Sequence, residues 1–158
     1  MSPSSNIRHL PPLGWVLVAN AARARCFARD EENNAMRELA SFVHPASRMK
    51  GQALDDDRGG LVHKGVASTQ FQPHTDPHDK EHEKFAREIA QYLDEAALAH
   101  RYPALTLLAS APFLGELRAQ LSPATQKLLR TIAALDLTAF EGAELEQRVA
   151  EALRTAAG

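Results

Sequence analysis

The sequence predicts an α/β fold: a mixed five-stranded sheet that opens with an N-terminal antiparallel meander and carries helices on its faces. Three observations predict it: three strand patterns within 15–44, a helical pattern that leads into a buried-strand pattern at 104–109, and alternating helix and strand patterns from there to the end. A length of 158 residues, 44% of them hydrophobic, is typical of one folded core. We expect a single domain at 15–158 behind a flexible tail at 1–14 that is rich in Ser and Pro.

Apolar spacing predicts the first three strands. Residues 15–19 form a continuous apolar run with two valines, which is typical of a central strand covered on both faces. Within 23–28, arginine alternates with small apolar residues, as in a strand with one buried face. A polar turn leads to a third strand at 36–44, and turns this short favour antiparallel pairing.

A long helix and a parallel strand are predicted next. Asp76 is a good N-cap, and Pro77 is tolerated at the first helical position, so the helix is expected to begin there. Its apolar residues recur at helical spacing until His100. A strand that follows such a crossover helix pairs in parallel, so we expect 104–109 to lie beside the first strand.

Three further elements complete the chain. A helix is predicted after Ser110, and Ser122 and Pro123 mark its end and the start of a new segment. The fifth strand is predicted at 128–135, although its first two leucines also fit a helical turn. A C-terminal helix follows, with a capping box between Thr138 and Glu141 as its expected start.

We expect the functional residues in the longest connection, 45–75. It contains four glycines and the run Asp55, Asp56 and Asp57, and it shows no sustained apolar period. Structureless connections longer than about 12–15 residues are uncommon in compact domains, and they are usually functional or disordered. Within it, Gly59 and Gly60 would let the backbone approach RNA closely and Arg58 would contact phosphate, whereas the alternative is a plain flexible surface loop.

Composition limits the function classes. A net charge of −2 and a pI near 6.4 give no overall field for nucleic acid or anionic lipid, so any RNA contact has to be local. Cys26 is the only cysteine, which excludes an internal disulfide, and we expect it to be buried. The chain shows neither a signal peptide nor an apolar run of ~18 residues. We therefore expect a cytoplasmic protein without membrane contact.

Histidines suggest a metal site. His74, His78 and His82 are spaced by four, and the last two would share one helix face, as paired metal-binding imidazoles do. The alternative, which we favour, is a solvated first turn whose acidic residues suit the helix dipole.

Asn20, Arg23 and Arg25 lie where α/β sheets often bind ligands, at the end of the first strand and in the second. The alternative is a hairpin turn with exposed arginines, which we favour. A two-metal nuclease needs several convergent carboxylates, and the first strand offers none.

The sequence resembles a bacterial family of host attachment proteins, described as required for attachment to host cells. The resemblance covers about 15–153 and rests on WVLVANAARARCF, TDPHDKEHEKFAREIAQYL and LTLLASAPFLGELRAQL. The order of elements also resembles the ribonuclease-H-like topology.

This family is in turn similar to the central domain of archaeal and eukaryotic class I peptide-chain release factors. That domain carries a Gly-Gly-Gln loop, which enters the peptidyl-transferase centre, before a long helix. Here Arg58, Gly59, Gly60 and Leu61 precede the helix in the same way over a match of about 15–121. The resemblance implies that the glutamine positions water against the peptidyl ester, and Leu61 has no polar group for that role.

Three functional hypotheses follow. The first is a non-catalytic binding protein that contacts the ribosome or tRNA and needs no cofactor. The second is a peptidyl- or aminoacyl-tRNA ester hydrolase that uses the same loop, and the third is a factor that affects attachment to host cells from inside the cell. The candidate contacts to RNA are Arg58, Gly59, Gly60, Leu61, Arg48, Lys50 and Lys64.

Overall fold

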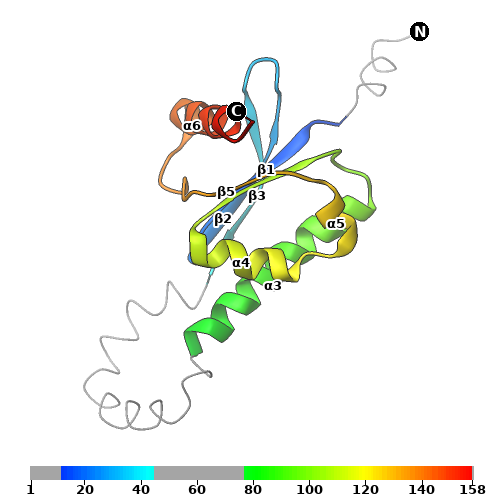
Figure 1. The fold of residues 1–158 in the computed structure, drawn as a ribbon, viewed down its shortest axis with the longest axis vertical. Coiled ribbons are helices and arrows are strands. Elements are labelled where there is room, and N and C mark those ends of the chain that lie inside the picture. The colour runs from blue at the N-terminus through cyan, green and yellow to red at the C-terminus, as the bar shows by residue number, and fades with distance from the viewer. Residues whose placement is uncertain (1–11, 45–76, 158) are drawn as a thin grey trace.

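The protein forms a mixed five-stranded sheet with helices on both faces (Figure 1). The computed structural model describes residues 12–44 and 77–157, and in the second range it describes the side chains of residues 80–156. The strand order is β3-β2-β1-β4-β5, with β1 in the centre. The predicted tail, apart from its last residues, and the predicted loop at 45–75 lie outside the described residues.

The antiparallel meander is confirmed. It consists of β1 (Gly14–Ala19), β2 (Arg23–Arg29) and β3 (Met36–Val43). β1 pairs with β2 and β2 with β3, both antiparallel, and a bulge between Cys26 and Phe27 shifts the second register. Five of the six residues of β1 are buried, as expected for its apolar run, and Cys26 is buried too.

The crossover to a parallel strand is also confirmed. Helix α3 (Pro77–Leu98) leads to β4 (Leu105–Ala109), which pairs in parallel with β1. His100 ends the helix in a left-handed backbone conformation with φ of 59°, while Arg101 N–H donates to the carbonyl of Ala96. This arrangement satisfies carbonyls at the end of the helix, usually with glycine in the place of His100.

The β4–β5 connection holds two helices, α4 (Ala111–Gln120) and the short α5 (Pro123–Lys127). From the sequence, Ser122 and Pro123 are predicted to end the preceding helix, and no helix is predicted at α5. The Ser122 hydroxyl caps this helix by accepting from the Thr125 N–H, and Asp94 of α3 accepts from the backbone N–H of Ser122. β5 (Leu129–Ala134) then pairs in parallel with β4, as predicted within one residue at either end.

Two apolar layers sandwich the sheet. On one face, Leu17 and Leu107 pack against Phe85 and Ile89 of α3 and Leu117 of α4. On the other face, side chains of the sheet pack against Leu145 and Val149 of α6 (Gly142–Ala157). These sheet residues are Val16, Val18, Phe27 and Leu108. The carboxyl ends of β1, β4 and β5 are thereby left between two helical layers.

The predicted start of α6 is wrong. The helix begins at Gly142, and the Leu145 N–H donates to the carbonyl of Glu141. The Thr138 hydroxyl, expected to cap the helix, donates instead to Asp136 at 2.7 Å. Thr138 is 5% exposed, so its polar groups are satisfied by the sheet edge rather than by a helix end.

Candidate functional site

The candidate site is one edge of the sheet, called here the carboxyl edge. Register brings the ends of β1, β4 and β5 together there, because Ala19 pairs with Ala109 and Ala109 pairs with Ala134. β2 begins and β3 ends at the same edge, since Arg23 pairs with Val43. Open α/β sheets commonly bind ligands at such an edge.

Asn20 connects two segments that are far apart in the sequence. Its Oδ1 accepts from the backbone N–H groups of Ala22 and Arg23, at 2.8 and 2.9 Å, and so shapes the turn between β1 and β2. Its Nδ2 donates to Asp136 at 2.9 Å and to the Thr138 hydroxyl at 3.0 Å. One side chain therefore fixes the β1–β2 turn against the connection between β5 and α6.

Asp136 is held in its ionised form. Partial burial raises its pKa, but hydrogen bonds from Asn20 and Thr138, together with the positive charge of Arg23, outweigh burial and lower the pKa below its ordinary value. An ionised carboxylate accepts hydrogen bonds but cannot donate a proton. Asp136 is thus suited to holding the edge together rather than to general acid catalysis.

The lowered pKa predicts a pH-dependent effect of Asp136→Asn. A carboxyl with a lower pKa in the folded state contributes stability above its unfolded pKa, about 3.8, and loses that contribution as the pH falls through the folded value. The wild type is therefore expected to exceed Asp136→Asn in unfolding free energy at neutral pH, by a difference that shrinks below pH 3.8. Urea denaturation across this range measures the difference.

Glu151→Gln, on an exposed position of α6, controls for the loss of one surface charge. A difference between wild type and Asp136→Asn that stays constant, or grows as the pH falls, would contradict the assignment.

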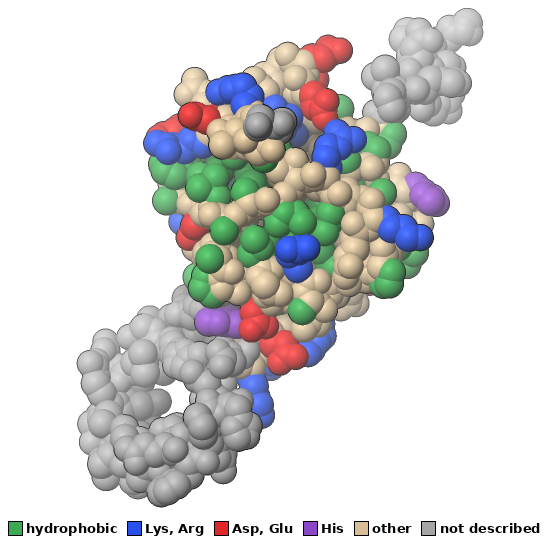
Figure 2. Space-filling model, viewed as in Figure 1, with side chains coloured by type: hydrophobic (Ala, Val, Ile, Leu, Met, Phe, Trp, Pro, Cys, Tyr) green, Lys and Arg blue, Asp and Glu red, His purple; other side chains and the backbone are tan. Residues whose placement is uncertain are grey.

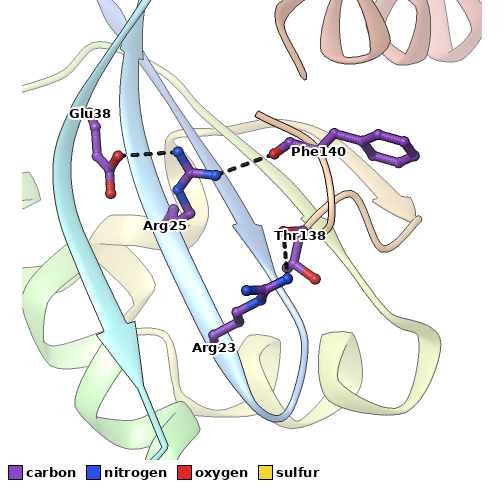
Figure 3. A network of polar contacts seen from close by, with 5 residues as sticks. All are labelled: Arg23, Arg25, Glu38, Thr138 and Phe140. Atoms are coloured by element: carbon purple, nitrogen blue, oxygen red, sulfur yellow. Dashed lines mark hydrogen bonds and ion pairs between the residues drawn. The ribbon is translucent and has the colours of Figure 1, made fainter. Parts of the chain in front are cut away.

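Two arginines of β2 hold the connection between β5 and α6 (Figure 3). Arg23 donates to the Thr138 carbonyl at 2.9 Å, and Arg25 donates to the Phe140 carbonyl at 3.3 Å. Arg25 also forms an ion pair with Glu38 of β3 at 3.2 Å. The hairpin turn is as predicted, but the expectation of exposed arginines is wrong for Arg25, whose side chain is 21% exposed.

His44 forms the link between the sheet and the start of α3. Its ring stacks on Phe85 with centroids 5.1 Å apart and lies edge-on to His82 at 6.4 Å. Its Nε2 lies 3.8 Å from a carboxylate oxygen of Glu81, and its side chain is 4% exposed. This contact was not predicted from the sequence, although His44 continues the apolar alternation through Phe42.

The predicted metal site is only partly within the described residues. His82 lies beside His44, whereas His74 and the side chain of His78 lie outside the described part of the chain. Within that part, no group of three or more His, Cys, Asp or Glu side chains could hold a metal ion. Binding of a metal by the three predicted histidines stays a prediction.

The candidate RNA contacts all fall outside the described residues. They belong to a segment that lies between two described residues, His44 and Pro77. The residues concerned are Arg48, Lys50, Arg58, Gly59, Gly60, Leu61 and Lys64. The chain enters this segment directly after β3, at the carboxyl edge, and leaves it directly before α3 (Figure 1). The contact of His44 with Phe85 holds the entrance and the first turns of α3 together.

Comparison with known proteins supplies the remaining evidence. A family model described as "Protein required for attachment to host cells" matches residues 15–149, which include β1 except its first residue, the other four strands and the first half of α6. An uncharacterised protein of Rickettsia prowazekii (strain Madrid E) is 28% identical over 108 residues, covering 67% of this chain and 68% of that protein. No helix within the described residues has the length and apolar character needed to cross a membrane. The chain belongs to the family of proteins required for attachment to host cells.

Proposed function

We propose that this protein is a non-catalytic RNA-binding protein that contacts the ribosome or tRNA through the segment 45–75. The observation that carries the proposal is the position of the two flanks of this segment. His44 follows the last residue of β3, at the carboxyl edge, and its ring packs against Phe85 in α3. α/β sheets commonly bind ligands at this edge. A binding segment mounted in this way is positioned by a rigid core.

The sequence of the segment supports RNA as the ligand. Arg58, Gly59 and Gly60 precede α3 as the Gly-Gly-Gln loop precedes a long helix in the release-factor central domain. The mixed sheet is consistent with that domain and with the ribonuclease-H-like topology expected from the sequence. Glycines permit close approach of the backbone, and arginine contacts phosphate.

Charge supports a local contact rather than a broad one. The segment 45–75 carries four basic residues, Arg48, Lys50, Arg58 and Lys64, against three aspartates. On the face drawn in Figure 2, basic and acidic side chains are interspersed. RNA affinity should therefore depend on few phosphate contacts and fall only moderately with salt.

Deletion of Arg58, Gly59 and Gly60 is expected to abolish cosedimentation with ribosomes. The full chain should sediment with them at moderate salt, and deletion of 68–70 in the same segment, which removes three uncharged residues, should leave binding intact.

Arg58→Gln should lower the slope of log affinity against log salt by about 0.7–0.9, the value for one lost phosphate contact. Failure of the unmodified chain to bind ribosomes or tRNA would contradict the proposal.

The hydrolase alternative is tested in the same preparation. Leu61 replaces the glutamine that orients water in release factors, so we expect release of peptide from peptidyl-tRNA at the rate in buffer. Release that depends on Gly59 and Gly60 would favour the hydrolase instead.

The family description concerns attachment to host cells, and we propose that the protein affects attachment from the cytoplasm. Cell fractionation tests this location. Protein recovered from the outer surface would favour a direct role in adhesion.

A further inference from the structure

A cavity of about 240 Å³ lies at the opposite end of the sheet from the carboxyl edge. It opens beside Gly14 at the start of β1, between Arg29 at the end of β2 and Arg130 near the start of β5. Thr106 and Thr131, which are partners across β4 and β5, line it from the sheet, and Leu153 lines it from α6. His44, after which the proposed RNA-binding segment begins, lies at the other end of the sheet and does not line this cavity.

Arg29 lines this cavity and carries an unpaired donor in its side chain. Its Nε atom is shielded from solvent and has no hydrogen-bond partner among the described residues. The same guanidinium donates from Nη2 to the side chain of Asn34 in the β2–β3 turn, which fixes its orientation. Buried polar groups in native proteins are almost always paired, so this shielded N–H leaves the guanidinium of Arg29 with hydrogen-bonding capacity that the described residues do not use, in a residue that lines the cavity.

Arg130 supplies a second and exchangeable cation. It pairs with Glu31 at 3.4 Å, and both side chains are more than 60% exposed. An ion pair this exposed is weak, because water screens it and two long side chains must be ordered. A ligand oxyanion could therefore replace Glu31 as the partner of Arg130. The cavity lining holds two guanidinium groups against one carboxylate, which makes it net cationic.

The other residues that line the cavity indicate which further groups the ligand carries and how large it is. The hydroxyls of Thr106 and Thr131 take part in no hydrogen bond between described residues, so both can serve an oxyanion. Val16 and Leu153 provide apolar wall next to them. The volume lies below the roughly 300–1,000 Å³ of pockets that hold drug-sized ligands, so the ligand is small.

We propose that this cavity binds a small organic anion, a phosphate or carboxylate on a short apolar stem. Arg29 holds the oxyanion through its fixed guanidinium, and Arg130 contacts it after leaving Glu31. The two threonines donate the remaining hydrogen bonds, and Val16 and Leu153 contact the stem. Phosphate and carboxylate share this recognition, because both accept parallel hydrogen bonds from one guanidinium.

The test uses the full-length protein and three probes: butyl phosphate, butanoate and inorganic phosphate. Each is titrated while the Arg29 Nε–H resonance is followed by NMR. Saturable movement of this resonance is expected with butyl phosphate or butanoate, and weaker binding with inorganic phosphate, which has no stem. The stronger of the first two identifies the anion class. Absence of saturation with all three probes, up to millimolar concentrations, would overturn the proposal.

Variants test the two cations separately. Arg29→Lys should weaken binding about tenfold, because an ammonium cannot present two parallel N–H bonds. Arg130→Gln should weaken binding several-fold, and Glu31→Gln, which removes the competing carboxylate, should strengthen it. Both residues are exposed, so these two variants keep the test valid if Arg29→Lys does not fold.

Arg87→Lys, on an exposed position of α3, is the matched control and should not change probe affinity. Equal affinity in Glu31→Gln, Arg130→Gln and the wild type would overturn the proposal. Ribosome cosedimentation should be unchanged in Arg130→Gln, which separates this cavity from the proposed RNA contact. Loss of cosedimentation there would mean that the cavity holds RNA phosphate rather than a small molecule.

Discussion

Phe85→Ala is expected to lower the free energy of unfolding by about 3–5 kcal/mol, the range for removal of a buried phenylalanine ring. Phe85 is 2% exposed and lies between the sheet and α4, with its ring 5.7 Å from that of Phe113. Its ring also stacks on that of His44, with centroids 5.1 Å apart. The substitution would leave a cavity at the point where the entrance to the segment 45–75 meets α3.

Denaturation by urea or guanidinium measures this loss. Leu98→Ala is the matched control, because Leu98 also belongs to α3 but is 70% exposed, and its effect should remain within about 0.5 kcal/mol. Similar losses for the two variants would contradict the assignment of Phe85 to the core. Phe85→Leu should lose less than Phe85→Ala, because leucine fills more of the space.

The sheet could be predicted because each of its strands carries a local apolar pattern. The run at β1 has side chains buried on both faces, since Leu17 faces α3 and Val18 faces α6. The helix between two such runs imposes parallel pairing of β4 with β1. These features depend on neighbours in the sequence, and so single-sequence patterns reveal them.

The predicted capping box failed because Thr138 has stronger partners than a helix end. A Thr followed by Glu three positions later is a good local start signal, yet Asn20, 118 residues away, meets Thr138 at the carboxyl edge. The same limit applies to Arg25, whose backbone partner Phe140 lies 115 positions away. No local pattern specifies such contacts, because they form only after the sheet places β2 beside the β5–α6 connection.

The candidate site could be predicted only in outline. Asn20 and Arg23 could be placed at this edge from the sequence. Their bonds to the Asp136 carboxylate and to the backbone carbonyl two residues further on could not be predicted. It did not select His44, whose burial becomes visible only when α3 packs over the end of β3. The proposed RNA contacts rest on the sequence and on the placement of the flanks.

Asn20→Ala is expected to lower the free energy of unfolding by about 2–3 kcal/mol. The side chain makes four hydrogen bonds, two within the β1–β2 turn and two to the β5–α6 connection. A typical hydrogen bond contributes about 0.5–1.5 kcal/mol, and donors or acceptors left unpaired add to the loss. Partial exposure of the edge allows water to replace some of these bonds, which keeps the expected loss below the sum.

Asn33→Ala in the β2–β3 turn is the matched control, because Asn33 is exposed and its Oδ1 accepts a single hydrogen bond, from the backbone N–H of Ala35. Its loss should stay near 1 kcal/mol or below, about the value of one hydrogen bond.

A double-mutant cycle isolates the long-range part of the Asn20 effect. Asn20→Ala and Asp136→Ala should be coupled by about 0.5–3 kcal/mol, as for residues that share a hydrogen-bond network. Additive losses would mean that the bond to Asp136 contributes little and that Asn20 acts through its own turn and through the Thr138 hydroxyl. Coupling would establish that the carboxyl edge is held as one unit, which a rigid mount for the segment 45–75 requires.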